Sequence, residues 1–398
     1  MPLLPTVELG CPGRPDPQLH VRDVARAIGP AIDEARLVIV QGDTSTAVGG
    51  ALGAAQAGIP VAHVEAGLRS HDRLNPCPEE DFRKAIDGLA ALLFAPTELS
   101  AANLRREAVS GQIEVTGNTG IDALVERLPL LRMRNVEGHQ RRLLVTCHRR
   151  ESWGEGLEAI ASCLRQIAGR GDVRISFVLH PNPRVADDMR RLLGGVSDIQ
   201  LRDPCSHLEM LQAMLDSDLV LSDSGGMQEE APTLGVPLLI LRDRTERPEG
   251  IASGDLKLVG RDPDRIRETV GALLDNPAAL ASMSRPSFPY GDGRASQRIA
   301  ASIETGSGGT NLDRHRSCRR QDQSSRRSSS LPEGSRLQFV ARGVVIELEA
   351  GRVRIALQLV EIDVEVGDPL FGVEVHDDRE IVLRCGLAHS RLIYGGRR

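Results

Sequence analysis

Lysine is almost absent from this 398-residue chain, which has only Lys84 and Lys257. Arginine therefore carries nearly all of the positive charge. The net charge at pH 7 is −6, an acidic balance that does not favour nucleic-acid binding. Arginine is left as the residue to contact any phosphate, a role for which its planar guanidinium is well shaped. The sequence therefore predicts no nucleic-acid partner.

The cysteines are few and scattered. The chain has seven, an odd number, and no CxxC pair, which argues against a disulfide framework or a zinc ribbon. We expect reduced thiols in a cytoplasmic protein. No apolar run approaches the ~18 residues that a membrane-spanning helix needs. The proline-rich start, MPLLPTVELGCPGRPDP, lacks the pattern of a signal peptide, so we expect neither a leader nor a membrane partner.

Short apolar runs alternate with helical patterns over most of the chain. The runs are rich in Leu, Val and Ile, as expected for strands buried on both faces of a sheet. They span residues 37–43, 60–67, 92–97, 113–118, 143–148, 175–182, 199–204, 219–226 and 237–243. This alternation predicts α/β structure with parallel, doubly wound sheets, whose carboxyl edges bind ligands.

A charged break at residues 132–142 separates the runs into two sets, which predicts two Rossmann-like lobes with a cleft between them. We expect an N-terminal lobe over 1–131 and a nucleotide-binding lobe over 132–285. Residues 305–336 are poor in apolar side chains and are typical of a disordered linker. Part of the remaining segment, 337–398, alternates as β-hairpins do. It is either a small β-rich module or sequence without an evolved fold.

Three acidic side chains follow consecutive strands of the first lobe. Asp43 lies in GDTST, Glu65 in HVEAGLRS, and Glu79 at the start of the helix that PCPEEDFRKAIDGLA predicts. Each alone is explained by a turn, a cap or the helix dipole. Because parallel strands end at one edge of a sheet, we expect the three carboxylates to gather there. Carboxylates in such a cleft suit proton transfer.

The stretch DSGGMQEEAPTLG has the pattern of a strand, a Ser-Gly-Gly turn and a helix. The N–H groups of Ser224, Gly225 and Gly226 would then lie at a helix N-terminus, where a phosphate binds readily. Glu230, one turn later, is placed to accept hydrogen bonds from ribose hydroxyls. An ordinary glycine turn is the simpler reading. Arg247 after the next strand makes a nucleotide diphosphate the better interpretation.

The stretch LLVTCHRRESWGEG opens the second lobe and contains Cys147 beside His148. Adjacent residues at a strand end point to opposite faces, which argues against a Cys–His nucleophilic pair. The sequence has no partner residues at the spacing of metal ligands. Gly154 and Gly156 come too far after the strand for a dinucleotide-binding fingerprint. His148 and the arginines after it suit an anionic leaving group, whereas we expect Cys147 to pack within the strand.

Eight motifs occur in order between residues 35 and 304: GDTST, HVEAGLRS, PEEDFR, TGNTGIDAL, CHRRESWG, DSGGMQEEAPTLGVP, RTERPE and PYGDGRAS. In this combination the chain closely resembles the non-hydrolysing bacterial UDP-N-acetylglucosamine 2-epimerases. The resemblance implies two Rossmann-like domains in a GT-B-like arrangement, a crossing-back helix at 286–304, an unrelated C-terminal tail and a homodimer. It also implies a UDP-sugar substrate, without cofactor or metal.

The resemblance also implies an activity and its residues. The family interconverts UDP-GlcNAc and UDP-ManNAc by eliminating UDP to a 2-acetamidoglucal and adding it back. The matching catalytic positions are Asp43, Glu65, Glu79 and His148. The matching UDP-binding positions are Ser224, Gly225, Gly226, Glu230 and Arg247. The family's opening GTRPE-type loop has no counterpart, so we expect the first lobe to be incomplete at its start.

Two other functions stay open at this point. A GT-B glycosyltransferase would share the fold and the nucleotide-binding lobe, but it needs no base for a sugar C2 proton. An inactive remnant would bind nucleotide through the second lobe without turning it over.

Overall fold

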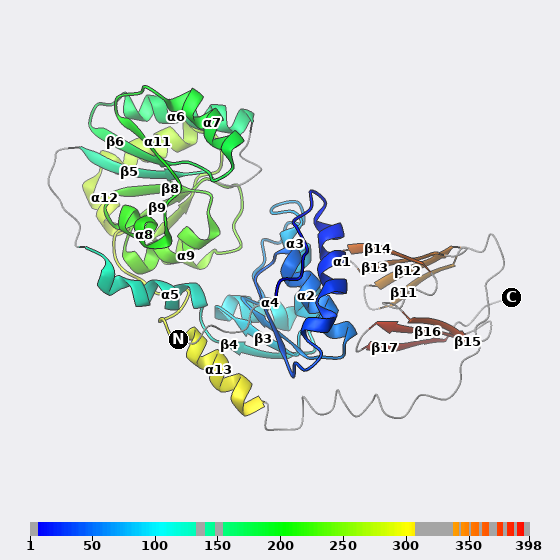
Figure 1. Ribbon diagram of the computed structural model, residues 1–398. Coiled ribbons are helices and arrows are strands. Elements are labelled where there is room, and N and C mark those ends of the chain that lie inside the picture. The colour runs from blue at the N-terminus through cyan, green and yellow to red at the C-terminus, as the bar shows by residue number, and fades with distance from the viewer. Residues whose placement is uncertain are drawn as a thin grey trace. The chain divides into compact units, whose positions relative to one another are not determined.

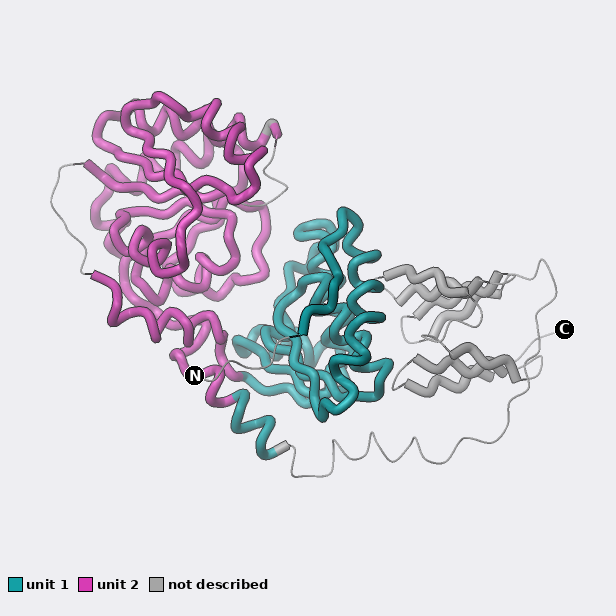
Figure 2. Tube along the Cα trace, viewed as in Figure 1, with its two compact units in different colours: residues 1–115, 299–398 teal, residues 116–298 magenta. Residues whose placement is uncertain are grey.

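The structure is a computed structural model that describes residues 7–132, 140–147 and 154–306, together with seven strands between residues 337 and 393. The chain forms two compact units, which Figure 2 colours separately. Unit 1 comprises residues 1–115 and 299–398, and unit 2 comprises residues 116–298. Each contains a parallel sheet with helices, which confirms the predicted α/β fold class. The lobe boundaries drawn from the sequence remain predictions.

The parallel sheet of unit 1 has four strands in chain order. They are β1 (Val38–Gln41), β2 (Val61–Val64), β3 (Leu92–Ala95) and β4 (Gln112–Val115). The helices that connect them are α2 (Ser45–Gln56), α3 (Glu79–Leu89) and α4 (Glu98–Arg106). Because right-handed crossovers that advance in one direction leave their helices on one face, these three share a core on one side of the sheet.

The side chains of unit 1 alternate between two cores, as the period of two in a strand requires. Val61 and Leu93 pack with the connecting helices. Their neighbours Ala62 and Phe94 point the other way and pack with Ile299 of α13 (Ala295–Gly306). The last residues of α13 therefore cover the second face of this sheet.

Helix α1 (Pro17–Ala27) was not predicted from the proline-rich start. Asp16 caps it by accepting a hydrogen bond from the Gln18 N–H, and Pro17 occupies the first turn, where it costs no hydrogen bond. The helix packs closely on α2 in Figure 1. A Cβ atom on Gly49 would lie 2.6 Å from Cβ of Val24, so the small residues of α2 permit this approach.

Unit 2 has a six-stranded parallel sheet in the order β10-β9-β8-β5-β6-β7. The strands are β5 (Arg141–Thr146), β6 (Val173–Val178), β7 (Ile199–Arg202), β8 (Leu219–Ser222), β9 (Leu238–Ile240) and β10 (Leu256–Leu258). The order reverses between β5 and β8, which lie side by side. This reversal is a topological switch point, where open α/β sheets bind ligands beyond the carboxyl ends of their strands.

Helices cover both faces of the unit 2 sheet (Figure 1). One face carries α6 (Glu155–Ala168), α7 (Pro183–Leu193), α11 (Pro263–Leu274) and α12 (Pro277–Ser282). The other carries α8 (His207–Leu215), α9 (Gly225–Leu234) and α10 (Glu249–Ala252). Helix α5 (Thr119–Arg127) precedes the sheet and packs on α9. Cys147 is 1% exposed in the first of these cores, which confirms its predicted packing role.

The chain beyond α13 contains antiparallel strands. The first group is β11 (Leu337–Ala341), β12 (Val344–Glu349), β13 (Arg352–Leu357) and β14 (Val360–Glu365), which form the hairpins predicted there. The second is β15 (Gly372–His376), β16 (Glu380–Cys385) and β17 (Ala388–Ile393). Most of the predicted linker, residues 307–336, lies outside the described residues. None of the described helices is long and apolar enough to cross a bilayer.

Candidate active site

Asp43 lies in the turn that follows β1, at the carboxyl edge of the unit 1 sheet. The next residue, Thr44, caps α2 by accepting a hydrogen bond from the Ala47 N–H at 3.1 Å, so Asp43 is not needed as the cap. Arg83 donates from Nη2 to Oδ2 of Asp43 at 2.6 Å. The Arg83 side chain is only 2% exposed, and its hydrogen bond therefore fixes one oxygen of a half-buried carboxylate.

Glu65 lies in the turn after β2 and has a backbone φ of 68°, in the left-handed region that only glycine adopts at little cost. Such strain persists where the surrounding structure enforces it, and it is concentrated at functional sites. A Cβ atom on Gly42 would lie 3.5 Å from Oε2 of Glu65. The turns that carry Asp43 and Glu65 are therefore adjacent, as the sequence predicted.

The first turn of α3 carries Glu79 and Glu80, and the structure distinguishes them. Glu80 is fully buried and accepts hydrogen bonds from the Ser70 N–H at 2.9 Å and the His71 N–H at 3.2 Å. It also accepts from Nη1 of Arg83 at 3.1 Å. Glu80 therefore holds the loop before α3, whereas Glu79 is half-buried at the helix start.

A second charged network lies deeper in unit 1. The ring of His63 is 2.6 Å from Oδ1 of Asp87 through Nδ1 and 2.9 Å from the Gly42 carbonyl through Nε2. Arg69 donates to Asp87 at 2.7 Å and to Glu107 at 2.6 Å. Burial alone would raise the pKa of Asp87, but the charges and hydrogen bonds of His63 and Arg69 hold it below its ordinary value.

The Ser-Gly-Gly turn of unit 2 joins β8 to the start of α9, beside the switch point. Ser224 is the N-cap residue, and its N–H donates to Oγ of Ser222 at 3.0 Å. That N–H is therefore engaged within the turn. The first-turn N–H groups of Gly225 and Gly226 have no partner of their own within a helix. A Cβ on Gly226 would meet nothing within 4 Å, so an anion could approach this turn closely.

Arg247 lies against this turn between two carboxylates. Its Nε donates to Glu229 and its Nη1 donates to Glu246. A Cβ on Gly225 would lie 2.9 Å from Nη1 of Arg247, so the absence of a side chain there makes room for the guanidinium. The Tyr290 hydroxyl donates to the Arg247 carbonyl at 2.9 Å. Both side chain and backbone of this arginine are thus held in place.

Glu230 is paired with His207, the first residue of α8. Nε2 of His207 lies 2.6 Å from Oε1 of Glu230, whose side chain is 13% exposed. Burial raises the pKa of Glu230, and the nearby His207 and Arg127 oppose that rise. The carboxylate lies one helical turn after the Ser-Gly-Gly turn, as predicted.

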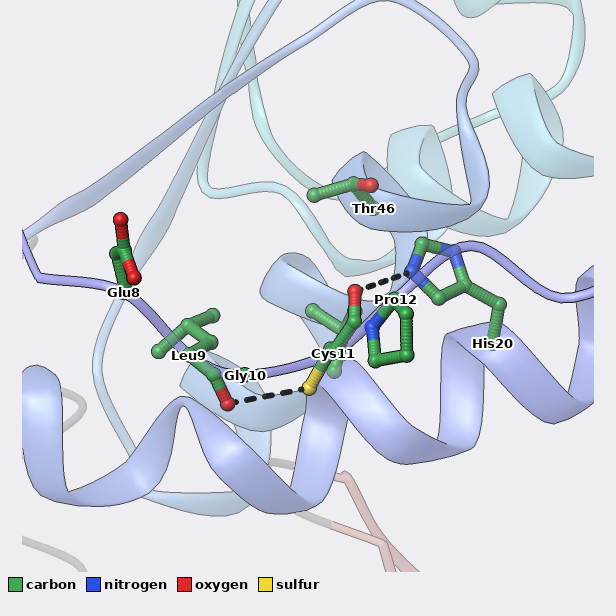
Figure 3. A pocket seen from close by; sticks show the side chains of 8 residues that line it. Glu8, Leu9, Gly10, Cys11, Pro12, His20 and Thr46 are labelled. Atoms are coloured by element: carbon green, nitrogen blue, oxygen red, sulfur yellow. Dashed lines mark hydrogen bonds between the residues drawn. The ribbon is translucent and has the colours of Figure 1, made fainter.

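A hollow of about 470 Å³ lies elsewhere in unit 1 (Figure 3). It is lined by Glu8, Leu9, Gly10, Cys11, Pro12, His20, Val24 and Thr46. None of the predicted site residues contributes to it. Nδ1 of His20 is 2.8 Å from Oγ of Ser45, which joins α1 to the start of α2. The hollow is therefore a feature of the α1–α2 packing, and we do not assign the active site to it.

Comparison with known proteins identifies the family. A sequence profile of UDP-N-acetylglucosamine 2-epimerases matches residues 26–304. The chain belongs to the UDP-N-acetylglucosamine 2-epimerase family. This epimerase is 45% identical over 285 residues to a probable UDP-N-acetylglucosamine 2-epimerase of Ralstonia solanacearum, a match that covers 68% of this chain and 76% of that protein. It is 43% identical over 282 residues to the UDP-N-acetylglucosamine 2-epimerase of Escherichia coli strain K12, covering 67% and 75% respectively.

Solved structures agree with this assignment. The UDP-GlcNAc 2-epimerase of Neisseria meningitidis, crystallised with UDP-GlcNAc, is similar with a TM-score of 0.70 and 35% identity. That match covers 74% of this chain and 84% of the Neisseria chain. A putative epimerase structure from Listeria monocytogenes gives a TM-score of 0.69 at 36% identity, over 75% and 81%. The family resemblance predicted from the ordered motifs is confirmed.

The predicted site residues of this epimerase fall into two groups. Asp43, Glu65 and Glu79 all belong to unit 1, and Ser224, Gly225, Gly226, Glu230 and Arg247 all belong to unit 2. His148, the remaining predicted residue, lies outside the described residues. In the described part of the chain, no cluster of His, Cys, Asp and Glu has a geometry that would hold a metal ion.

Several residues that shape the site were not predicted. Arg83 holds Asp43, and Glu246 holds Arg247. The stretch PEEDFRKAID could have predicted the role of Arg83, because residues three and four apart share a helix face. Glu80, Arg83 and Asp87 therefore form a charged stripe on α3, and all three are buried. A charged helix face that is buried in this way requires partners from other segments.

Proposed function

We propose that this epimerase interconverts UDP-GlcNAc and UDP-ManNAc. The observation that carries the proposal is the match to the Neisseria meningitidis epimerase bound to UDP-GlcNAc, which extends over 74% of this chain. The carboxylates in unit 1 and the Ser-Gly-Gly turn in unit 2 both lie within the family match at residues 26–304. Both groups of residues are therefore available to the reaction.

The chemistry explains why carboxylates are needed. C2 of the sugar carries an acetamido group but is not next to a carbonyl, so its proton is hardly acidic. A carboxylate removes this proton as the C1–O bond to UDP breaks, which forms the C1=C2 double bond of a 2-acetamidoglucal. A UDP oxygen then adds back at C1, and a carboxylic acid returns a proton to the opposite face of C2. General acid–base catalysis of this kind contributes about 10²–10⁴-fold.

We assign these proton transfers to Asp43, Glu65 and Glu79. Arg83 orients Asp43 through one oxygen, Oδ2. Among the described residues, no group hydrogen-bonds the other oxygen, Oδ1, which is therefore the one offered to substrate. Glu65 is held by a strained turn, and Glu79 by the first turn of α3. Such pre-positioning supports proton transfer because it spares reorganisation in the transition state.

We assign the nucleotide to unit 2. The Gly225 and Gly226 N–H groups and the Arg247 guanidinium would stabilise the departing diphosphate, with Ser224 immediately before them as the N-cap residue. Glu230 would accept hydrogen bonds from the ribose. His148 is assigned to the diphosphate on the family resemblance alone. The elimination requires only proton transfer and charge stabilisation, so we propose no cofactor.

A homodimer and a cytoplasmic location accompany the proposal on the same resemblance. Light scattering coupled to size-exclusion chromatography would test the first, because a dimer has twice the 43.0 kDa mass of the chain. Fractionation of the native host would test the second.

Proton NMR of UDP-GlcNAc with the purified chain in deuterated water tests the function. We expect UDP-ManNAc to appear and deuterium to enter C2. Replacing Asp43 with Asn should abolish both while leaving UDP binding intact. Absence of both UDP-ManNAc and C2 exchange would refute the proposal. UDP binding without turnover would then indicate a remnant, and sugar transfer without exchange a glycosyltransferase.

A further inference from the structure

The buried charged stripe of α3 contacts the loops that follow β1 and β2. Glu80 holds the loop at Ser70, and Arg83 holds Asp43. Asp87, the last member of the stripe along the helix, is 1% exposed. Burying an ionised carboxylate is costly unless it is fully paired, so the partners of Asp87 show what this position contributes.

Asp87 contacts three groups. Oδ1 is 2.6 Å from Nδ1 of His63. Oδ2 accepts hydrogen bonds from Nη2 of Arg69 at 2.7 Å and from the Gly67 N–H at 3.3 Å. The carbonyl of Gly67 in turn accepts from Nδ2 of Asn103 at 3.0 Å. Gly67 is thus held on both sides, two residues after Glu65.

His63 connects the same carboxylate to the turn of Asp43. Its Nε2 is 2.9 Å from the carbonyl of Gly42, the residue immediately before Asp43. One ring nitrogen of His63 thus faces Asp87 and the other faces the turn of Asp43. Arg69 pairs with both Asp87 and Glu107 in the same network.

We propose that Asp87 is a positioning residue for the epimerisation. It fixes the turn of Asp43 through His63, and it fixes the turn of Glu65 through the Gly67 N–H. One buried carboxylate thereby sets the positions of two proton-transferring carboxylates. The inference rests on the proposed function, which assigns proton transfer to Asp43 and Glu65. Displacing a reacting group by about 1 Å can cost about 10²-fold in rate.

The first test replaces Asp87 with Asn. The amide can still accept from His63, but its NH₂ group then opposes the Gly67 N–H and Arg69. We expect kcat for UDP-GlcNAc to fall about 100-fold, with KM changed less than about threefold because the nucleotide is assigned to unit 2. The matched control is Asp81→Asn on the same helix, which removes only the surface pair with Arg73. A D87N enzyme that matches D81N in kcat would overturn the inference.

A second test separates the two nitrogens of His63. In His63→Gln the side-chain amide replaces Nε2 as the donor to Gly42, whereas in His63→Asn it replaces Nδ1 as the donor to Asp87. Both variants remove the imidazole ring. If positioning runs through Gly42, H63Q should retain about tenfold more kcat than H63N. Equal kcat values in the two variants would overturn this route.

A third measurement does not need turnover. In the full chain labelled with ¹⁵N-histidine, Asp87→Asn should shift the ring-nitrogen signals of His63, whereas Asp81→Asn should leave them in place. Unchanged His63 signals in D87N would overturn the inference. Shifted signals in a chain that shows no C2 exchange would instead count against the proposed function.

Discussion

Unit 1 and unit 2 each hold an arginine between two carboxylates, and they differ in whether a member of this triad reaches the surface. In unit 1, Arg83 is 2% exposed between Glu80 and Asp43, and Asp43 is 29% exposed. In unit 2, Arg247 is 11% exposed, and its partners Glu229 and Glu246 are 8% and 1% exposed. The same ionic arrangement therefore presents a carboxylate in unit 1, whereas all three members are nearly buried in unit 2.

This difference shows that burial, more than residue type, decides what a charged group can do. A buried member of such a triad must keep its partners, because an unpaired buried charge is very costly. The more exposed member is free to exchange a partner for a ligand. The predictions below break one triad at a time, and then test weaker pairs.

Replacing Arg83 with Met should have the largest effect. It leaves the buried Glu80 without its counter-charge, which we expect to cost about 3–5 kcal/mol in unfolding free energy. It also releases Asp43, so C2 exchange should be lost. Calorimetry should show a lower melting transition for unit 1 and little change for unit 2.

The control for Arg83→Met is Arg73→Gln, since Arg73 is 57% exposed in its pair with Asp81. Surface pairs of this kind are worth about 0–1 kcal/mol. If both variants melt at the same temperature, the buried triad does not stabilise unit 1.

Replacing Gly225 with Ala should weaken the unit 2 triad next. The new Cβ would lie 2.9 Å from Nη1 of Arg247 and displace the guanidinium. We expect UDP to bind about tenfold more weakly, or about 1.4 kcal/mol, in isothermal titration calorimetry. Gly271→Ala on α11 is the control, because its Cβ would have only an ordinary 3.7 Å contact with Arg170. Unchanged UDP affinity in G225A would show that Arg247 does not bind the diphosphate.

Replacing His207 with Gln should have a smaller effect that depends on pH. His207 and Arg127 oppose the rise that burial imposes on the pKa of Glu230. Without His207 that pKa should rise further, so UDP affinity should begin to fall at a higher pH as the solution is acidified. We expect a shift of less than about one pH unit in calorimetric titrations. Arg191→Gln, at a surface pair with Asp188, should leave the profile unchanged. A shift to lower pH in H207Q would contradict the assigned pairing.

Replacing Asp292 with Asn should have the smallest effect. Hydrogen bonds from Arg298 lower the pKa of Asp292 from 3.8 to about 2. Because the folded pKa is lowered, the pair stabilises the protein above pH 4, and its contribution is lost as pH falls toward 2. The difference in melting temperature between wild type and D292N should shrink over that interval. Since Asp292 is exposed, the difference in melting temperature should be small. A difference that stays constant between pH 4 and pH 2 would contradict the assigned pairing with Arg298.

The local features of both units could be predicted from sequence. The turn before α9 depends on residues close together in the chain, and it appears as predicted. The triads could not be predicted, because Arg83 and Asp43 are 40 residues apart and meet only after the strands pair. Strand β10 (Leu256–Leu258) was also missed, because Lys257 interrupts its apolar residues, whereas the equally short β9 lies in a continuous apolar run.

The contact between α1 and α2 has a consequence for building chimeras. A Cβ atom on Gly53 would lie 2.2 Å from Cγ2 of Ile28, and one on Gly49 would meet Val24. The surface of α2 therefore fits one particular neighbouring segment. If α1 alone were replaced by the corresponding helix of a relative, its side chains would not match the small residues of α2. The two helices should therefore be exchanged together.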